Sequence, residues 1–274
     1  MFKADLHSHS TYSDGRLSVK ELLDRAKKNG INVLGLTDHD STFGVEEAHK
    51  YGKEIGIYVL KGLELSTRYK GQNCHLVCYF ENNEVPQEMM EFSQNIIDTR
   101  NARAVKMMNL IHEIYGANID LDDLFKGGTI ITRGNMYRSL LKSNPNLDPE
   151  VVSSFVANDS KAFIPASEMT PQDGIKMIKK HKSIIILAHP TLMDYENVCD
   201  VVKMGIDGIE ARYPLNKEGE EAKFRQLAKE NNLFVSAGSD FHGDTKHAEV
   251  GTSTLEKDEF DIIAKRLNIN YENN

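Results

Sequence analysis

Histidine and carboxylate side chains recur at the ends of short apolar segments in this chain of 274 residues. We predict that each of these apolar segments forms a β-strand. In a parallel α/β barrel the carboxyl ends of the strands lie on one face, so these side chains are expected to meet there. In chain order they are His7-Ser8-His9, Thr37-Asp38-His39-Asp40, Glu64, His75, His189 and Ser239-Asp240-Phe241-His242.

Two of these groups have a spacing that suits metal binding. His7 and His9, like Asp240 and His242, are two residues apart, so in an extended chain both side chains of a pair point the same way. A single pair is commonly structural, but the repetition at successive strand ends favours a metal site. Imidazole and carboxylate ligands without thiolate suit Mn, Fe or Zn and fit Ca or Mg poorly. We therefore predict two to three divalent transition-metal ions as cofactors.

Some polar residues beside these groups are expected to play other parts. Cys74 precedes His75, points to the opposite face of the strand, and is predicted to be a buried thiol rather than a ligand. Asp38 and Asp40 are expected to support the ligands or to form turns.

The segments that position these residues alternate between strands and helices. The strands are predicted at 2–6, 33–37, 58–65, 75–80, 184–188, 208–211 and 234–237. The helices are predicted at 18–28, 45–54, 171–181, 195–204 and 217–231. Ser18 and Glu21 have the spacing of a capping box at the start of the first helix. This alternation predicts an α/β fold with a largely parallel sheet or barrel.

The alternation is interrupted between residues 86 and 166, where apolar residues recur at helical spacing. We interpret 86–166 as a mostly helical insertion that serves as a substrate-binding subdomain, flanked by a metal-binding barrel made of 1–85 and 167–274. The alternative is an ordinary barrel helix followed by a long loop, but ~80 residues without a clear strand exceed a normal connection.

A series of short motifs surrounds the candidate ligands. The motifs are Asp5-Leu6-His7-Ser8-His9-Ser10, Ser13-Asp14-Gly15, Leu36-Thr37-Asp38-His39-Asp40, Gly62-Leu63-Glu64, His75, Ala188-His189-Pro190 and Gly238-Ser239-Asp240-Phe241-His242-Gly243. Together they resemble the PHP family, the polymerase and histidinol phosphatase superfamily, over nearly all of the two alternating blocks. The resemblance implies a distorted, TIM-like (β/α)7 barrel of the PHP type with a trinuclear metal site.

The resemblance also implies how the ligands are shared among three ions. The first ion would be held by His7, His9, Glu64 and Asp240. The second would be held by Glu64, which bridges the two ions, His75 and His189. The third would be held by Asp14, His39 and His242. Among these residues, the expected catalytic ones are Glu64, Asp240 and His189. All of these positions carry side chains able to bind metal, which argues against a non-catalytic copy.

Within the family, the insertion resembles that of the nucleotide phosphoesterase branch, which acts on nucleoside monophosphates, nucleoside 3',5'-bisphosphates or the 5' ends of short RNAs. Members of that branch carry an Arg-Pro-His segment with a second arginine. Here Thr132-Arg133-Gly134-Asn135-Met136-Tyr137-Arg138 keeps both arginines but lacks the Pro and His, and Gly208-Ile209-Glu210-Ala211-Arg212-Tyr213-Pro214 is also similar. The resemblance implies that the substrate is bound by Arg133, Arg138, Arg212 and Tyr213. For each arginine, a surface ion pair is the alternative.

These features predict a metal-dependent phosphoesterase that hydrolyses a phosphomonoester by means of a hydroxide bridging two metal ions. The favoured substrate is a nucleotide, either a nucleoside monophosphate or a 3',5'-bisphosphate. The alternative is a 5'-3' exoribonuclease that acts on short 5'-phosphorylated RNA. A histidinol-phosphate phosphatase is disfavoured because that branch usually has histidine where Asp14 stands. The complete ligand set disfavours a non-catalytic metal-binding accessory module.

Composition limits the partners and the compartment. With 33 basic and 41 acidic residues, the net charge of -8 disfavours a long, sequence-independent nucleic-acid footprint. The first residues lack the basic and apolar regions of a signal peptide, and every apolar run is far shorter than the ~20 residues that cross a bilayer. Three cysteines are too few for a disulfide framework, so we expect a cytoplasmic protein. The expected partner is a small phosphorylated substrate, a nucleotide or short RNA, with no membrane and no obligate protein partner.

Overall fold

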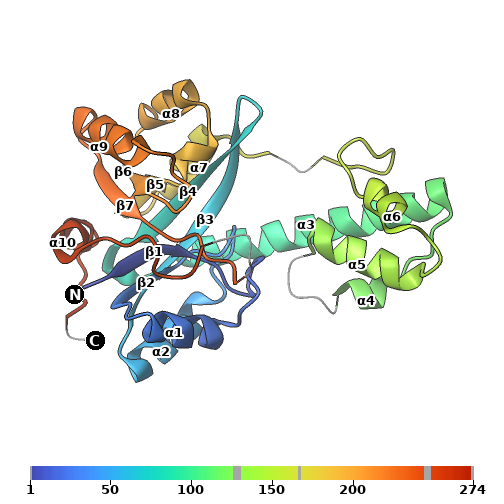
Figure 1. Cartoon of the computed structure of the whole chain (residues 1–274), viewed down its shortest axis with the longest axis horizontal. Helices are drawn as coiled ribbons and strands as arrows, with labels where there is room; N and C mark the ends of the chain where they lie inside the picture. The colour runs from blue at the N-terminus through green and yellow to red at the C-terminus, as the bar shows by residue number, and fades with distance from the viewer. Residues whose placement is uncertain (1, 126–130, 166–167, 244–247, 273–274) are drawn as a thin grey trace. The chain divides into compact units, whose positions relative to one another are not determined.

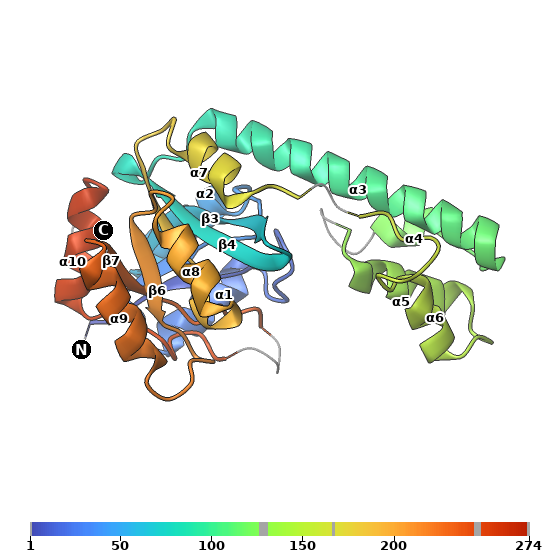
Figure 2. The same cartoon turned by 90° about the horizontal axis from the view of Figure 1, so that it is seen from above.

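The computed structural model describes residues 2–125, 131–165, 168–243 and 248–272. The chain divides into two compact units, which we call the barrel unit (Met1–Glu91 and Glu168–Asn274) and the insertion unit (Phe92–Ser167). Within the described residues, all strands belong to the barrel unit (Figures 1 and 2).

The barrel unit contains a seven-stranded sheet in which the spatial order of the strands follows the sequence (Figure 1). The strands are β1 (Ala4–Ser8), β2 (Val33–Leu36), β3 (Tyr58–Tyr69), β4 (Gln72–Phe80), β5 (Ser183–Leu187), β6 (Gly208–Arg212) and β7 (Phe234–Ala237). β1 contacts β7, and Ser8 pairs with Phe241 just beyond β7, so the sheet is nearly closed into a barrel. The predicted α/β class and TIM-like barrel are therefore confirmed.

One strand runs against the others. β4 is antiparallel to β3 and to β5, whereas the remaining neighbouring pairs are parallel. The reversal follows from the two-residue turn between β3 and β4, in which Lys70 and Gly71 both have positive φ, at 47° and 81°. Such turns match the twist of a β-hairpin and force the strands to be antiparallel. As a result, the beginning of β4 lies beside the carboxyl end of β3, where His75 pairs with Ser66.

The helices of the barrel unit lie close to the predicted positions. Among the described residues they are α1 (Val19–Lys28), α2 (Val45–Ile55), α7 (Pro171–Ile178), α8 (Tyr195–Val202), α9 (Glu220–Glu230) and α10 (Lys257–Arg266), with 3-10 turns η1 (Glu81–Asn83) and η2 (Pro190–Leu192). The capping box of Ser18 and Glu21 at the start of α1 is confirmed. α10 has no counterpart among the helices predicted from the sequence.

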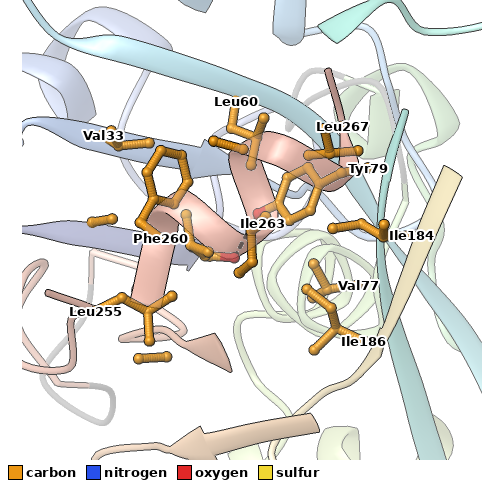
Figure 3. Packing of buried hydrophobic residues seen from close by; sticks show 14 of the residues in the cluster. Val33, Leu60, Val77, Tyr79, Ile184, Ile186, Leu255, Phe260, Ile263 and Leu267 are labelled. Atoms are coloured by element: carbon orange, nitrogen blue, oxygen red, sulfur yellow. Dashed lines mark hydrogen bonds between the residues drawn. The ribbon is translucent and has the colours of Figure 1, made fainter. Parts of the chain in front are cut away.

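α10 contributes to the main hydrophobic core. Its residues Phe260 and Ile263 are fully buried in a cluster with side chains from six of the seven strands, among them Leu60 and Ile186 (Figure 3). A second cluster packs α1 and α2 against β2 and β3. These two cores fix the strand ends that carry the candidate ligands.

Helices are the only regular secondary structure among the described residues of the insertion unit. It contains the greater part of α3 (Gln87–Tyr115), followed by α4 (Leu121–Phe125), α5 (Arg133–Ser143) and α6 (Pro149–Phe155). Its own core includes Met107, Met108 and Ile111 of α3, packed with Leu140 and Val152. The predicted helical character of the insertion is confirmed, whereas its role in substrate binding stays a prediction.

Along the described parts of the chain, each helix is either too short or too polar to cross a lipid bilayer.

Candidate metal centre

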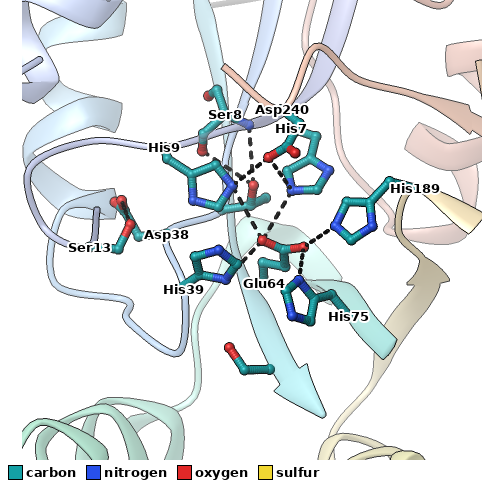
Figure 4. A network of polar contacts seen from close by, with 12 residues as sticks. His7, Ser8, His9, Ser13, Asp38, His39, Glu64, His75, His189 and Asp240 are labelled. Carbon is teal, nitrogen blue, oxygen red and sulfur yellow. Dashed lines mark hydrogen bonds and ion pairs between the residues drawn. The ribbon is translucent and has the colours of Figure 1, made fainter. Parts of the chain in front are cut away.

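The candidate ligands come together at one end of the barrel (Figure 4). β1 carries His7 and is followed by His9, and β2 is followed by His39. β3 and β4 carry Glu64 and His75. His189 follows β5, Asp240 and His242 follow β7, and Asp14 lies between β1 and α1. The reversed direction of β4 explains why a residue near its beginning joins residues at the carboxyl ends of the parallel strands.

Glu64 lies at the middle of this arrangement (Figure 4). Its Oε2 atom lies 3.3 Å from Nε2 of both His7 and His9 and 2.9 Å from Nδ1 of His39. Its Oε1 atom lies 3.0 Å from Nδ1 of His75 and 3.0 Å from Nε2 of His189. The two carboxylate oxygens therefore serve different sets of histidines, which is the geometry expected of a bridging ligand.

Three groups of ligand atoms are compact enough to hold an ion each. The groups are His7, His9, Glu64 and Asp240; His9, Asp14, His39 and His242; and His39, Glu64 and His75. The first group is the set implied for the first ion. The second adds His9 to the set implied for the third ion. The third group contains His39 where the resemblance implied His189, although His189 contacts the same Glu64 oxygen as His75.

The buried polar atoms of this centre fit a cation. Nε2 of His7, Nε2 of His9, Oε2 of Glu64 and Oδ1 of Asp240 are buried and have no hydrogen-bond partner in the described part of the protein. They nevertheless approach one another, with 3.1 Å between His9 Nε2 and Asp240 Oδ1. A buried polar atom left without a partner costs about 1–3 kcal/mol. A divalent ion would satisfy all four atoms at once, so the residues present fit the predicted metal.

The electrostatics favour positive charge at the same place. Burial alone would lower the pKa of His39, but the neighbouring carboxylates, Glu64 first, outweigh it and raise the pKa to about 10. Burial likewise would lower the pKa of His7, yet Glu64, Glu210 and Asp240 raise it well above its usual value. The centre therefore attracts cations, and metal ions would compete with protons for the imidazole nitrogens.

Asp38 and Asp40 hold the loops that carry the ligands. Asp38 accepts hydrogen bonds from the Ser10 backbone N–H at 2.7 Å and from the Ser13 hydroxyl at 2.6 Å. Asp40 accepts one from the Ser66 N–H at 2.7 Å. Both aspartates therefore stabilise backbone beside the centre. Cys74 is buried, as predicted.

Sequence reasoning missed two buried carboxylates beside the ligands. Oε1 of Glu210, on β6, lies 3.1 Å from Nδ1 of His7, and its Oε2 accepts a hydrogen bond from the His189 backbone N–H. Asp5, on β1, accepts hydrogen bonds from the N–H groups of Ser239 and Gly251. Each is an acidic residue with an apolar neighbour on both sides in its strand, Ala4 and Leu6 for Asp5 and Ile209 and Ala211 for Glu210. That pattern was a usable signal, because a carboxylate is rarely buried without a specific partner.

The predicted substrate-binding residues have different surroundings. The Tyr213 hydroxyl donates to Oδ2 of Asp240 at 3.1 Å and so reaches the centre. Arg212 is instead paired with Glu221 and donates to the Thr254 carbonyl. Arg133 and Arg138 are exposed on α5 of the insertion unit, whereas every ligand of the centre belongs to the barrel unit. The roles of the three arginines stay predictions.

A cavity of about 440 Å³ opens at the centre. Its lining contains six candidate ligands: Asp14, His39, His75, His189, Asp240 and His242. The rest of the lining is Gln72 and Asn73 from β4 and the exposed Leu192 from η2. Pockets that bind small molecules have volumes of this order.

Comparison with known proteins places the chain in a family. The PHP domain matches residues 5–239. A 5'-3' exoribonuclease of Haemophilus influenzae is 31% identical over 91% of this chain and 93% of its own length. A phosphoribosyl 1,2-cyclic phosphate 1,2-diphosphodiesterase of Eggerthella lenta is 25% identical, over 87% of this chain and 94% of the relative. A 3',5'-nucleoside bisphosphate phosphatase of Chromobacterium violaceum is 27% identical, over 88% of each chain.

Solved structures agree on the fold. The structure of a predicted metal-dependent phosphoesterase from Bifidobacterium adolescentis superposes with a TM-score of 0.77 at 23% identity, covering 96% of this chain and 95% of the other. The domain match, the full-length relatives and the ligand set identify the protein as a metal-dependent phosphoesterase. The chain belongs to the PHP domain family.

Proposed function

We propose that this enzyme hydrolyses the phosphomonoester of a nucleotide, either a nucleoside monophosphate or a nucleoside 3',5'-bisphosphate. The observation that carries the proposal is the cavity of about 440 Å³, which combines six candidate ligands with the apolar side chain of Leu192. A single phosphate can approach the ligands while an organic group of nucleotide size occupies the remaining space. The bisphosphate phosphatase of Chromobacterium violaceum is a full-length relative that supports this choice of substrate class.

The residues of the centre have two proposed roles. Some would hold the metal ions, and others would position the residues that hold them. When bound, two to three divalent ions (Mn, Fe or Zn) supply Lewis acidity and an activated water for attack on phosphorus. Glu64, Asp240 and His189 would hold them as the catalytic ligands. The Tyr213 hydroxyl, which donates to Oδ2 of Asp240 at 3.1 Å, would orient that carboxylate.

The insertion unit is proposed to bind the rest of the substrate. Arg133 and Arg103 lie close enough to interact: burial lowers the pKa of Arg103, and the charges of Arg133 and Arg100 lower it further. Such a cluster of arginines suits an anionic ligand, because guanidinium groups donate paired hydrogen bonds to phosphate. For a bisphosphate substrate, we propose that Arg133, together with Arg138, contacts the phosphate that is not hydrolysed.

The second candidate function is 5'-3' exoribonuclease activity on short 5'-phosphorylated RNA. The observation in its favour is the identity of 31% with the Haemophilus influenzae exoribonuclease over nearly the full length of both proteins. The net charge of -8 weighs against a long RNA footprint, but a short RNA requires few contacts. We propose a cytoplasmic location for either activity, since Cys74, Cys78 and Cys199 are free thiols.

A substrate panel tests the proposal. The manganese-loaded enzyme is incubated with nucleoside monophosphates, 3',5'-bisphosphates, short 5'-phosphorylated RNA and phosphoribosyl 1,2-cyclic phosphate, and kcat/KM is measured for each. We expect the highest value for a mononucleotide, with release of inorganic phosphate. The Asp240→Asn variant, which lacks a ligand charge, controls for contaminating phosphatase. A higher kcat/KM for RNA, with stepwise release of mononucleotides, would establish the exoribonuclease instead.

A further inference from the structure

Glu210 is a buried carboxylate that no predicted ligand set includes. It lies on β6, and its side chain is 2% exposed. The β6–β7 register shifts between Glu210 and Arg212. Irregularities of this kind often redirect a side chain beside an active site. Burying a charge is costly unless specific partners compensate for it, so the partners of Glu210 indicate why it is there.

The first partner of Glu210 is the imidazole of His7. Oε1 of Glu210 lies 3.1 Å from Nδ1 of His7. A carboxylate at this position accepts a hydrogen bond, which places the imidazole proton on Nδ1 and leaves Nε2 free as a ligand. Nε2 points to the other side of the ring, where Glu64 Oε2 and Asp240 Oδ1 lie at 3.3 and 3.5 Å.

The second partner is the backbone of His189. Oε2 of Glu210 accepts a hydrogen bond from the His189 N–H at 2.7 Å. His189 has φ 27° and ψ 59°, a left-handed conformation that costs a non-glycine residue about 1–3 kcal/mol. The hydrogen bond that the His189 N–H donates to Glu210 stabilises this conformation, in which Nε2 of His189 lies 3.0 Å from Oε1 of Glu64.

The neighbouring residue Gly238 gives Glu210 room to reach His7. A β-carbon at position 238 would lie 2.2 Å from Cβ of His7 and 2.6 Å from Oε1 of Glu210. Both distances are too short for any side chain, so only glycine allows the Glu210–His7 contact. Two positions of the sequence therefore make this contact possible. Glu210 supplies the carboxylate, and Gly238 leaves the space that the carboxylate occupies.

From this geometry we infer that Glu210 is a positioning residue of the metal centre, which sets the tautomer of His7 and the backbone of His189 and so aligns ligands on both sides of Glu64. The inference rests on the metal-dependent function proposed above. Glu210 would not touch the ions or the substrate. Residues that orient metal-binding histidines in this way typically change metal affinity by about 10- to 100-fold when they are removed.

The test compares manganese affinity in metal-free wild-type protein and in Glu210→Gln, Glu210→Ala and Glu168→Gln, by competition with a chelator. Glutamine offers one acceptor oxygen, so it can keep one of the two contacts but not both. We expect affinity to fall roughly 10- to 100-fold in both Glu210 variants. Glu168→Gln is the matched control, because Glu168 is half-exposed and pairs with Arg68, and it should bind as the wild type does. Circular dichroism checks that each variant is folded.

Equal affinity in folded Glu210 variants and the wild type would overturn the inference. If the variants do not fold, nitrogen NMR of the histidine side chains in the zinc-loaded wild-type protein provides the test. It measures which ring nitrogen of His7 carries the proton. We expect a proton on Nδ1 of His7, and a proton on Nε2 would also overturn the inference. Failure of the wild type to bind manganese or zinc would count against the metal-dependent function, so the two failures are distinguishable.

Discussion

At the scale of single residues, the properties of the centre depend most on Glu64. It is fully buried, and its two oxygens contact histidines from β1, the β2 end, β4 and the β5 end. Burial would raise the pKa of this carboxyl, but His39, His7 and His75 lower it well below its usual value. The surrounding imidazoles therefore favour the ionised, negatively charged form of Glu64.

We predict that Glu64→Gln is among the most damaging single substitutions. The amide has nearly the same shape, but it lacks the charge that two ions would share. The wild type is expected to hold two to three ions per chain and to lose activity on chelation. The variant should lose at least one ion, and its turnover should fall by on the order of a hundredfold or more.

Elemental analysis and steady-state kinetics on the same samples check this prediction. Glu168→Gln, which changes a half-exposed carboxylate in the same unit, provides the control. Full metal content together with wild-type turnover in Glu64→Gln would show that Glu64 is not a ligand. Fewer than one ion in the wild type, with activity that survives chelation, would refute the metal centre itself.

Single residues also show what the sequence can and cannot reveal about this site. His7, His9 and Asp240 were predictable because histidines and carboxylates are conspicuous after apolar strands. Glu210 was not, because its partner His7 is 203 positions away and only the closure of the barrel brings the two together. His9 and His39 each belong to two of the candidate metal-binding groups. The spacing of residues in the sequence does not determine the distances on which this sharing depends.

At the scale of elements, the β3–β4 hairpin places His75 at the centre. Its turn uses Lys70 and Gly71 in left-handed conformations. The turn joins two strands that the sequence analysis predicted separately, and the direction of β4 follows from it.

Predicting a largely parallel sheet was correct for four of the six neighbouring pairs of strands. The helix α10 has no counterpart among the predicted helices, although Lys257–Arg266 carries apolar residues at helical spacing.

We predict that Gly71→Ala destabilises the barrel unit. Gly71 has φ 81°, and no atom lies within 4 Å of the place where a β-carbon would stand, so the cost comes from backbone strain alone. A residue with a β-carbon in the left-handed region costs about 1 kcal/mol. The free energy of unfolding, measured with urea, should fall by this amount.

Gly134→Ala makes the same chemical change in the helix α5, where φ is not positive. Alanine stabilises helices relative to glycine, so this control should not lower the free energy of unfolding. If Gly71→Ala unfolds at the same urea concentration as the wild type, Gly71 does not adopt a left-handed conformation in this turn.

At the scale of the whole molecule, the chain combines a barrel unit that contains every candidate ligand with an insertion unit that has its own hydrophobic core. The sequence analysis placed an insertion at 86–166 because the alternation of strands and helices is lost after residue 85. It also predicted the chemistry, because metal ligands are encoded in local motifs. Substrate choice is harder to predict, since it depends on residues such as Arg133 whose motif departs from that of the family branch.

The last prediction concerns Arg133, at the first turn of α5. Its side chain is exposed and donates to Oδ1 of Asn158, so it can exchange this contact for a phosphate. Loss of one charge-assisted contact costs about 1.5–3 kcal/mol, so Arg133→Ala should lower kcat/KM for the true substrate by roughly ten- to a hundredfold. It should leave hydrolysis of an aryl phosphate nearly unchanged, because the single phosphate of that substrate is bound at the metal centre. Lys106→Ala removes an exposed positive charge from the same unit and should affect neither substrate. Equal losses on both substrates would mean that Arg133 supports the fold or the metal centre, and selection of the substrate would then have to lie in the barrel cavity beside Leu192.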